Sequence, residues 1–208
     1  MKKARIAVLV SGGGTNLQAL IDAEKSGIIK SGEINLVISS KEGVYALERA
    51  KKANIRTITV AKKDFSGDQE RFEKALISAL SENESDLIIL AGFMSILSKD
   101  FTSRFEGRII NIHPSLIPSF CGEGFYGLRV HEAALKMGVK VTGATVHYVN
   151  EIPDGGKIIM QKAVDILDGD TPETLQRRVM ENAEWIILPL SLEKVCMEIK
   201  EKKTNGAV

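Results

Sequence analysis

An asparagine and a histidine stand two residues apart at the end of one apolar run. Asn111 and His113 lie in the segment NIHPSL, which ends the run at 108–112 and is closed by Pro114. Alternate residues of a strand point to the same side, so the amide and the imidazole are expected to face one spot. Two such donors suit the stabilisation of an oxyanion at a carbonyl carbon. A lone histidine is more often a packed or solvated residue, but the adjacent amide and the strand-end position favour catalysis.

A carboxylate from further along the chain is the candidate partner of this histidine. Asp154 lies in the segment IPDGG, where an ordinary turn aspartate is the simplest interpretation. The alternative is that the turn folds back and sets the carboxylate beside His113, which would favour the imidazolium. His147, in the run ATVHYV, is a second candidate for the site or a buried structural group. His131 is expected to be a surface residue of a short helix at 130–137.

A glycine triplet marks a possible anion site. The segment SGGGTN at 11–16 stands where an apolar run ends and helical spacing begins. Glycines let the backbone approach a ligand, and the free N–H groups of a helix start attract phosphate. The segment lacks the third glycine of a dinucleotide fingerprint, where Leu17 stands, and no acid follows the second strand. A phosphate monoester held by Gly14, Thr15 and Asn16 fits better, with a tight turn that binds nothing as the alternative.

The elements that must position these residues alternate regularly in the first half of the chain. Short apolar runs occur at 6–10, 34–38, 57–60, 87–90 and 108–112, and helical spacing occurs at 17–23, 44–53 and 68–83. Unbroken apolar runs are typical of strands buried on both faces. Their alternation with helices predicts an α/β fold with a three-layer, mostly parallel, Rossmann-like sheet.

The second half of the chain has a different pattern. Strand-like stretches at 139–149 and 157–165 are joined by an Asp-Gly turn, so they are expected to form an antiparallel C-terminal strand pair at the edge of the sheet. Thr171 and Pro172 predict the start of a C-terminal helix. Pro189 is expected to kink or break that helix.

Length and composition limit the organisation and the partners. The 208 residues fit one domain over 1–200, with an N-terminal phosphate or nucleotide half at about 1–100, a catalytic half at about 101–200 and a frayed tail at 201–208. The 28 Lys and Arg against 27 Asp and Glu give a net charge of +1, which offers nucleic acid or a membrane no bulk attraction. The first apolar run is too short for a signal peptide, and the two distant cysteines indicate neither a disulfide framework nor a metal site. We therefore expect a cytoplasmic protein with small-molecule substrates, as a monomer or homodimer.

Five blocks of sequence together resemble a known family. They are SGGGTNLQAL, LAGFMSILS, NIHPSLIPSF, GATVHYVNEIPDGGKIIMQ and RVMENAEWIILPL, and they extend from residue 6 to about residue 190. In this order they resemble the folate-dependent glycinamide ribonucleotide formyltransferases. The resemblance implies a single formyltransferase domain that moves the formyl group of 10-formyltetrahydrofolate to the amine of 5'-phosphoribosylglycinamide in purine biosynthesis, with no metal.

The resemblance also implies a role for each matching residue. Asn111 and His113 stabilise the oxyanion, His113 serves as proton donor, and Asp154 pairs with His113. The implied substrate-binding residues are Gly14, Thr15, Asn16 and Glu184, the last for the ribose hydroxyls. The implied folate-binding residues are Met94, Ser95, Ile96, Leu97, Asn111, His147, Asn150, Glu151, Ile152, Pro153 and Asp154.

The sequence departs from the family pattern in four places. Ser95 stands where many relatives carry Arg or Lys, and the segment 65–70 offers no clear counterpart to an arginine that some relatives use on the folate. The glycine-rich loop at 121–127 is longer than usual. The segment between Val179 and Pro189 is one residue longer than in some relatives.

Three rival functions remain to be separated. A 10-formyltetrahydrofolate hydrolase shares the catalytic domain, but it normally carries an N-terminal regulatory domain, for which we expect no room, and a histidine where Pro114 stands. A methionyl-tRNA formyltransferase would need an RNA-binding extension and a basic face. A non-catalytic nucleotide-binding module would leave the combination of Asn111, His113 and Asp154 unexplained.

Overall fold

The computed structural model describes residues 2–204 and contains one seven-stranded sheet with the strand order β3-β2-β1-β4-β5-β6-β7. The strands are β1 (Ala4–Val10), β2 (Gly32–Ser39), β3 (Arg56–Thr59), β4 (Leu87–Leu90), β5 (Ile109–His113), β6 (Val141–Tyr148) and β7 (Ile158–Asp165). The first five strands run parallel, while β6 pairs antiparallel with β5 and β7 pairs antiparallel with β6. The predicted sheet and its antiparallel C-terminal pair are confirmed.

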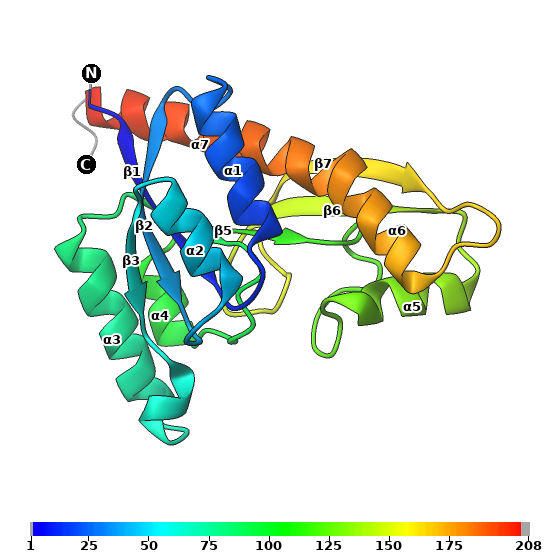
Figure 1. Cartoon of the computed structure of the whole chain (residues 1–208), viewed down its shortest axis with the longest axis horizontal. Coiled ribbons are helices and arrows are strands. Elements are labelled where there is room, and N and C mark those ends of the chain that lie inside the picture. The colour runs from blue at the N-terminus through cyan, green and yellow to red at the C-terminus, as the bar shows by residue number, and fades with distance from the viewer. Residues whose placement is uncertain (1, 205–208) are drawn as a thin grey trace.

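Helices cover both faces of the sheet (Figure 1). They are α1 (Thr15–Lys25), α2 (Tyr45–Lys52), α3 (Gln69–Glu82), α4 (Lys99–Arg104), α5 (Leu128–Met137), α6 (Pro172–Val179) and α7 (Trp185–Thr204), with a short 3-10 turn at Lys62–Phe65 and a π-helical turn at Met180–Glu184. None of the helices in residues 2–204 is long and apolar enough to cross a membrane.

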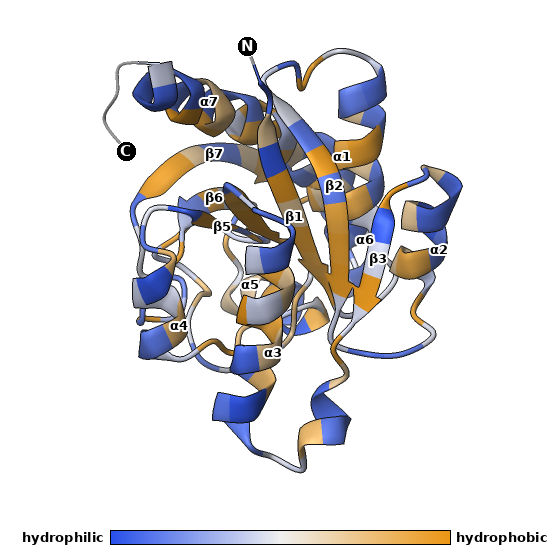
Figure 2. Ribbon diagram, turned by 90° about the vertical axis from the view of Figure 1, so that its left-hand side faces the viewer, coloured by the Kyte–Doolittle hydropathy of each residue, from blue (hydrophilic) through white to orange (hydrophobic). Residues whose placement is uncertain are grey.

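The two faces of the sheet carry separate hydrophobic cores, because successive side chains of a strand point in opposite directions. On β1, Ile6 and Val8 pack with α1, α2 and α7, whereas Ala7 and Leu9 pack with α3 and α4. Figure 2 shows the inner strands as largely hydrophobic ribbon and the outer turns of the helices as hydrophilic. The expected three layers follow from this division.

The C-terminal helical region differs from expectation in one respect. Thr171 caps α6 and Pro172 occupies its first turn, as predicted. Of the kink or break predicted at Pro189, the break is wrong, since α7 runs on to Thr204. The irregular turn comes earlier, at Met180–Glu184, where the N–H of Trp185 donates to the carbonyl of Met180, five residues back.

This π turn lies within the segment from Val179 to Pro189, where the sequence predicted one residue more than in some relatives. A π turn takes one residue more than an α turn and leaves the helix continuous, so an insertion can be absorbed in place. Residues 201–204, which were expected to begin the frayed tail, continue α7, and residues 205–208 lie outside the described part of the chain.

The start of β2 yields a test of core packing. A Cβ atom on Gly32 would overlap the buried side chain of Ile6 and lie 2.8 Å from Sγ of Cys196. Because the core has no room for the extra methyl group, Gly32→Ala is expected to lower the free energy of unfolding by about 1–3 kcal/mol. Gly12→Ala is the control, since a Cβ there meets nothing within 4 Å. Urea denaturation measures both variants, and an unchanged midpoint for Gly32→Ala would refute the tight packing.

Candidate functional site

The predicted site residues gather at the carboxyl ends of β1, β4 and β5. These three strands are parallel neighbours, so the loops that follow them lie at one edge of the sheet. The chain order reverses between β1 and β4, and open α/β sheets bind ligands at such a switch point. A hydrogen bond joins two of the loops, because the N–H of Met94 after β4 donates to Oγ of Ser11 after β1, at 2.9 Å.

Antiparallel pairing places the catalytic candidates beside one another. Asn111 on β5 is directly opposite His147 on β6, and Nδ2 of Asn111 lies 3.2 Å from Nε2 of His147. Nδ1 of His147 donates to the carbonyl of Tyr148 at 2.8 Å. With its hydrogen on Nδ1, the neutral form of the ring accepts one amide hydrogen of Asn111 at Nε2 and leaves the second amide hydrogen available for a ligand, whereas the protonated form donates from Nε2 to Asp154.

The turn between β6 and β7 folds back to bring in the carboxylate. Oδ2 of Asp154 lies 3.5 Å from Nδ1 of His113, and Oδ1 lies 3.5 Å from Nε2 of His147. The fold-back depends on glycine, since a side chain on Gly156 would overlap the backbone of Tyr148. The structure therefore places Asp154 beside His113, as the second interpretation of the turn predicted.

The loop after β5 contacts both members of this pair. Nε2 of His113 donates to the carbonyl of Phe120 at 2.9 Å, and the N–H of Gly122 donates to Oδ2 of Asp154 at 2.9 Å. The glycine-rich loop at 121–127 thus begins against the catalytic groups. His113 itself is 4% exposed and is not among the described residues that line the pocket.

Burial and charge act in opposite directions on the two ionisable groups. Burial lowers the pKa of His113, and this effect outweighs the opposite effects of the Asp154 charge and of the bond to Phe120. The expected attraction is present but does not hold the ring as an imidazolium. Burial alone would raise the pKa of Asp154, yet the bond from His147, the charge of His113 and the N–H of Gly122 bring it below its ordinary value. Asp154 is therefore ionised at neutral pH.

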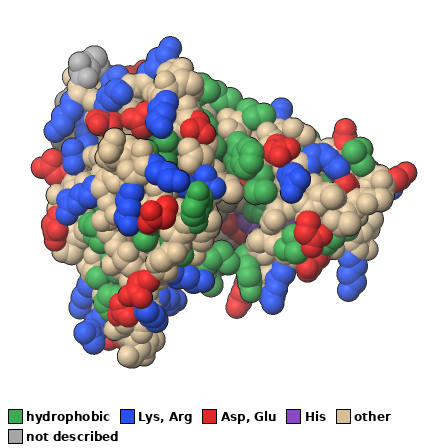
Figure 3. Space-filling model, viewed as in Figure 1, with side chains coloured by type: hydrophobic (Ala, Val, Ile, Leu, Met, Phe, Trp, Pro, Cys, Tyr) green, Lys and Arg blue, Asp and Glu red, His purple; other side chains and the backbone are tan. Residues whose placement is uncertain are grey.

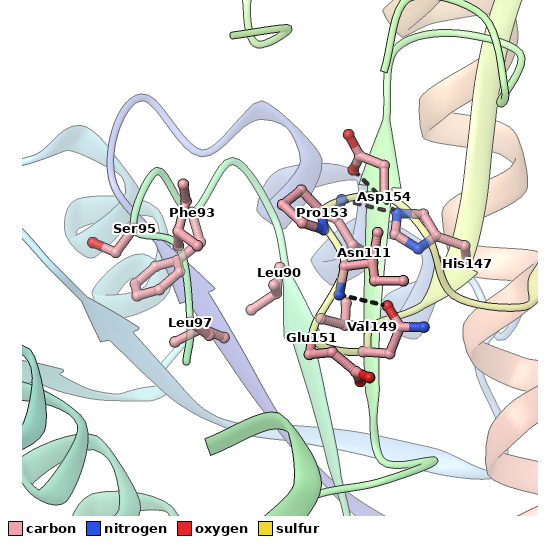
Figure 4. Close-up of a pocket in the computed structure, with 13 residues that line it drawn as sticks. Leu90, Phe93, Ser95, Leu97, Asn111, His147, Val149, Glu151, Pro153 and Asp154 are labelled. Carbon is pink, nitrogen blue, oxygen red and sulfur yellow. Dashed lines mark hydrogen bonds and ion pairs between the residues drawn. The ribbon is translucent and has the colours of Figure 1, made fainter. Parts of the chain in front are cut away.

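A pocket opens beside this cluster. Figure 4 shows Asn111, His147 and Asp154 at one end and Phe93, Ser95 and Leu97 at the other. Ten of the residues implied in folate binding line it: Ser95, Ile96, Leu97, Asn111, His147, Asn150, Glu151, Ile152, Pro153 and Asp154. Met94 does not, since it is half exposed and contributes its N–H to Ser11.

Sequence reasoning missed three residues of the pocket wall, Leu90, Phe93 and Val149. The available signal was position, because Leu90 ends β4 and Val149 directly follows β6. No Lys or Arg is among the described residues that line the pocket. Gln69, from the segment that lacked a counterpart arginine, donates instead to the carbonyl of Ile96 at 3.0 Å.

The space-filling view places the site in a hollow of the surface. Figure 3 shows the hollow between the larger body of the molecule and the part that carries α5 and α6. Acidic and histidine side chains are visible at its floor, with hydrophobic side chains around its rim. Apolar walls with a few convergent polar groups are typical of small-molecule sites.

The glycine loop and Glu184 form the second part of the site. Gly14 adopts the left-handed conformation (φ +72°) at the start of α1. Nδ2 of Asn16 donates to Oε2 of Glu184 at 2.7 Å, which links the loop to the π turn. Oδ1 of Asn16 is buried and has no partner among the described residues. Thr15 lies close by, with its hydroxyl 3.8 Å from Sδ of Met180.

His131 is not the surface residue that we expected. It lies on α5 and is 0% exposed, with Val130 and Ala134 buried on the same helix. Burial and the nearby His113 lower its pKa to about 4. Neither ring nitrogen has a hydrogen-bond partner within residues 2–204. The expectation failed because the polar residue type was taken as a sign of exposure, whereas His131 lies on the helix side that buries Val130 and Ala134.

Comparisons with known proteins agree with this geometry. The formyl transferase family matches residues 4–191. Phosphoribosylglycinamide formyltransferase of Haemophilus influenzae is 45% identical over 193 residues, which cover 93% of this chain and 86% of that protein. The crystal structure of glycinamide ribonucleotide transformylase 1 from Symbiobacterium toebii has a TM-score of 0.87 and 39% identity, and the match covers 94% of this chain and 89% of that one.

A longer relative matches over a small part of its length. The human trifunctional purine biosynthetic protein adenosine-3 is 44% identical over 207 residues, which are all of this chain but 20% of that protein. The chain therefore spans about a fifth of the length of that relative.

The buried carboxyl of Glu184 generates a pH prediction. Burial raises its pKa from 4.5 to about 7, against the opposing effect of Asn16. The folded chain retains a proton that the unfolded chain releases, so the free energy of unfolding falls as pH rises from about 4.5 to about 7. Glu184→Gln cannot ionise, and we expect it to lose this part of the pH dependence and to exceed the wild type in stability above about pH 7.

Urea denaturation at about pH 5 and about pH 8 makes this comparison. Glu181→Gln is the matched control, because Glu181 lies on the same π turn with an exposed side chain. If Glu184→Gln and the wild type lost stability in parallel, the carboxyl would not be the group that titrates.

Proposed function

Because the chain belongs to the formyl transferase family, we propose that it transfers the formyl group of 10-formyltetrahydrofolate to the amine of 5'-phosphoribosylglycinamide in purine biosynthesis. The products are phosphoribosyl-N-formylglycinamide and tetrahydrofolate. The single observation that carries the proposal is the convergence of Asn111, His113 and Asp154 at the end of an apolar pocket. The glycine loop at the same sheet edge supplies a place for the substrate phosphate.

The first task of the site is to stabilise charge on the formyl oxygen. Attack of the neutral amine on the formyl carbon forms a C–N bond and moves an electron pair onto the oxygen. The unused amide hydrogen of Asn111 is available for that oxygen, because His147 holds the other one. One such donor lowers the activation barrier by about 3 kcal/mol. His147 thus orients the side-chain amide of Asn111.

The second task is to move a proton from the attacking nitrogen to N10, which leaves with the electron pair of the broken C–N bond. Ionised Asp154 accepts the proton, and neutral His113, with Nδ1 facing Asp154, takes part in its transfer. Proton transfer is most efficient through a group whose pKa lies near the operating pH, and an imidazole is closer to that range than a carboxylate. Nε2 of His113 already donates to Phe120, so Nδ1 is the nitrogen free for this role.

The reaction requires no covalent enzyme intermediate. The hydroxyl of Ser115 donates to the carbonyl of Ser119 at 2.6 Å, and the thiol of Cys121 donates to the carbonyl of Pro118 at 3.2 Å. Neither nucleophile has a base beside it in these bonds, and burial raises the pKa of the Cys121 thiol. In a direct transfer, holding the two substrates next to each other in the reactive orientation lowers the activation barrier by several kcal/mol.

The two substrates are proposed to bind in the two parts of the site. The pocket lined by residues 95–97 and 150–154 takes the folate, with Met94 joining the loop to Ser11. Gly14, Thr15 and Asn16 bind the phosphate, and the carboxylate of Glu184 accepts hydrogen bonds from the ribose hydroxyls. Both substrates are soluble small molecules, so we place the activity in the cytoplasm.

An absorbance assay tests the proposal directly. The protein is mixed with 10-formyltetrahydrofolate in the presence and in the absence of 5'-phosphoribosylglycinamide. Loss of formylfolate only with the amine substrate supports transfer. Loss without it would indicate a 10-formyltetrahydrofolate hydrolase, and no loss in either mixture would indicate a binding module. The similarity to the phosphoribosylglycinamide formyltransferase of Haemophilus influenzae, over 93% of this chain and 86% of that protein, favours the first outcome.

The role of Asp154 makes a sharper prediction. Asp154→Asn removes the proton acceptor, so we expect kcat to fall by about 10²–10⁴ while the KM for the formyl donor changes little. Asp168→Asn, an exposed aspartate in the turn after β7, is the control for loss of one carboxylate. Near-normal turnover of a folded Asp154→Asn variant would show that the assigned role is wrong.

A further inference from the structure

Two consecutive carbonyl groups of the glycine loop are held by α2. The N–H of Ala46 donates to the carbonyl of Gly12 at 3.2 Å. Nε of Arg49, one turn further along, donates to the carbonyl of Gly13 at 2.8 Å. The loop also packs closely on the helix, since a Cβ on Gly14 would lie 2.6 Å from Cβ of Ala46. The conformation of the loop therefore depends on residues that follow β2, not only on its own sequence.

These bonds set the direction of the N–H groups in the loop. In a planar trans peptide the carbonyl and the following N–H point in opposite directions. With the Gly13 carbonyl drawn toward Arg49, the N–H of Gly14 must point away from α2. The loop is open on other sides, because a Cβ on Gly12 or Gly13 would meet nothing within 4 Å. An anion that enters the loop thus meets N–H groups that are already oriented.

Arg49 is itself held in place by three contacts. Besides its bond to Gly13, Nη1 donates to Oε1 of Gln18 on α1 at 3.1 Å. The guanidinium carbon lies 4.8 Å from the centroid of the Tyr45 ring. The side chain is half-buried between α1 and α2, so its positive charge has a fixed position beside the loop. Arginine suits this role because its planar group donates in several fixed directions and stacks on aromatic rings.

We propose that Arg49 is a positioning residue for the phosphate of a sugar-phosphate substrate. It fixes the Gly13–Gly14 peptide so that the N–H of Gly14 faces the phosphate, and it adds a positive charge that favours the dianion. Because Nε and Nη1 are already used within the protein, Arg49 acts through the loop and not as a catalytic residue. The identity of the phosphate ester rests on the proposed function, whereas the orientation of the loop does not.

The matched control is Lys52 on the same helix. Its ammonium lies 5.8 Å from the centroid of the same Tyr45 ring, and its side chain is exposed. Lys52→Gln removes the same charge as Arg49→Gln without touching the glycine loop. Arg49→Lys keeps the positive charge and a single ammonium donor group, so this conservative variant should retain part of the affinity for phosphate that Arg49→Gln loses.

Steady-state kinetics separate phosphate positioning from a general structural role. Arg49→Gln is expected to raise the KM for 5'-phosphoribosylglycinamide about tenfold, the effect of one hydrogen bond to a charged group. The KM for the formyl donor and kcat should change less than about twofold, since both depend on the other part of the site. Inhibition by inorganic phosphate should weaken about tenfold in parallel. Lys52→Gln should match the wild type, and Arg49→Lys should lie between.

Two results would overturn the proposal. The first is an unchanged KM for the phosphorylated substrate and unchanged phosphate inhibition in Arg49→Gln. The second is an equal rise in both KM values together with a lower denaturation midpoint, which would mean that Arg49 only stabilises the fold. If the wild type transferred no formyl group, the proposed function would fail. Calorimetric titration of wild type and Arg49→Gln with inorganic phosphate would still decide the role of Arg49, because equal affinities contradict it.

Discussion

A carboxylate that is removed from water must find charged or hydrogen-bonding partners, and this constraint governs the site around Asp154. Its side chain is 13% exposed, and the unpaired burial of such a group would cost several kcal/mol. The N–H of Gly122 donates to it, and a ring nitrogen of His113 and one of His147 each lie 3.5 Å from it, where a protonated ring would pair with the charge. Those partners come from β5, from β6 and from the loop after β5. The reversal from parallel to antiparallel pairing at β5 is therefore what allows the carboxylate to be there at all.

Two carboxyl groups of the site have surroundings that give them opposite properties. Asp154 has His147, the charge of His113 and the N–H of Gly122 beside it, so its pKa falls below the ordinary value despite burial. Glu184 has a single donor, Asn16, and its pKa rises to about 7. An acid that stays ionised is suited to accept a proton. One that titrates near neutrality responds strongly to ligand hydroxyls that favour its charged form. Environment, more than residue type, assigns the two roles.

Much of the fold was predictable because it rests on local patterns. The apolar run at 87–90 coincides with β4, and the stretches at 139–149 and 157–165 contain β6 and β7. Helix geometry was less predictable. The π turn and the continuation of α7 past Pro189 depend on packing against the sheet, which propensity does not reveal. The burial of His131 depends equally on which side of α5 faces inward.

The site was predictable in its parts but not in its distances. Residue types and strand-end positions identified Asn111 and His113, the turn sequence offered the pairing of Asp154 with His113 as one of two interpretations, and the resemblance added Glu184. The sequence did not show that His147 orients the amide of Asn111, since this follows from the register between β5 and β6. It also did not show that burial would outweigh the Asp154 charge on His113, because these opposing effects must be compared in the folded chain.

The most direct test of the account is a crystal structure with a stable analogue that joins both substrates through a tetrahedral carbon. We expect the oxygen on that carbon to lie within hydrogen-bond reach of Nδ2 of Asn111, at roughly 2.7–3.2 Å. The carboxylate of Asp154 should face the nitrogen on the opposite side of the carbon. The contrary result is a tetrahedral carbon more than about 6 Å from both side chains, with the analogue bound elsewhere on the sheet edge. The convergence of these groups would then serve the fold and not the reaction.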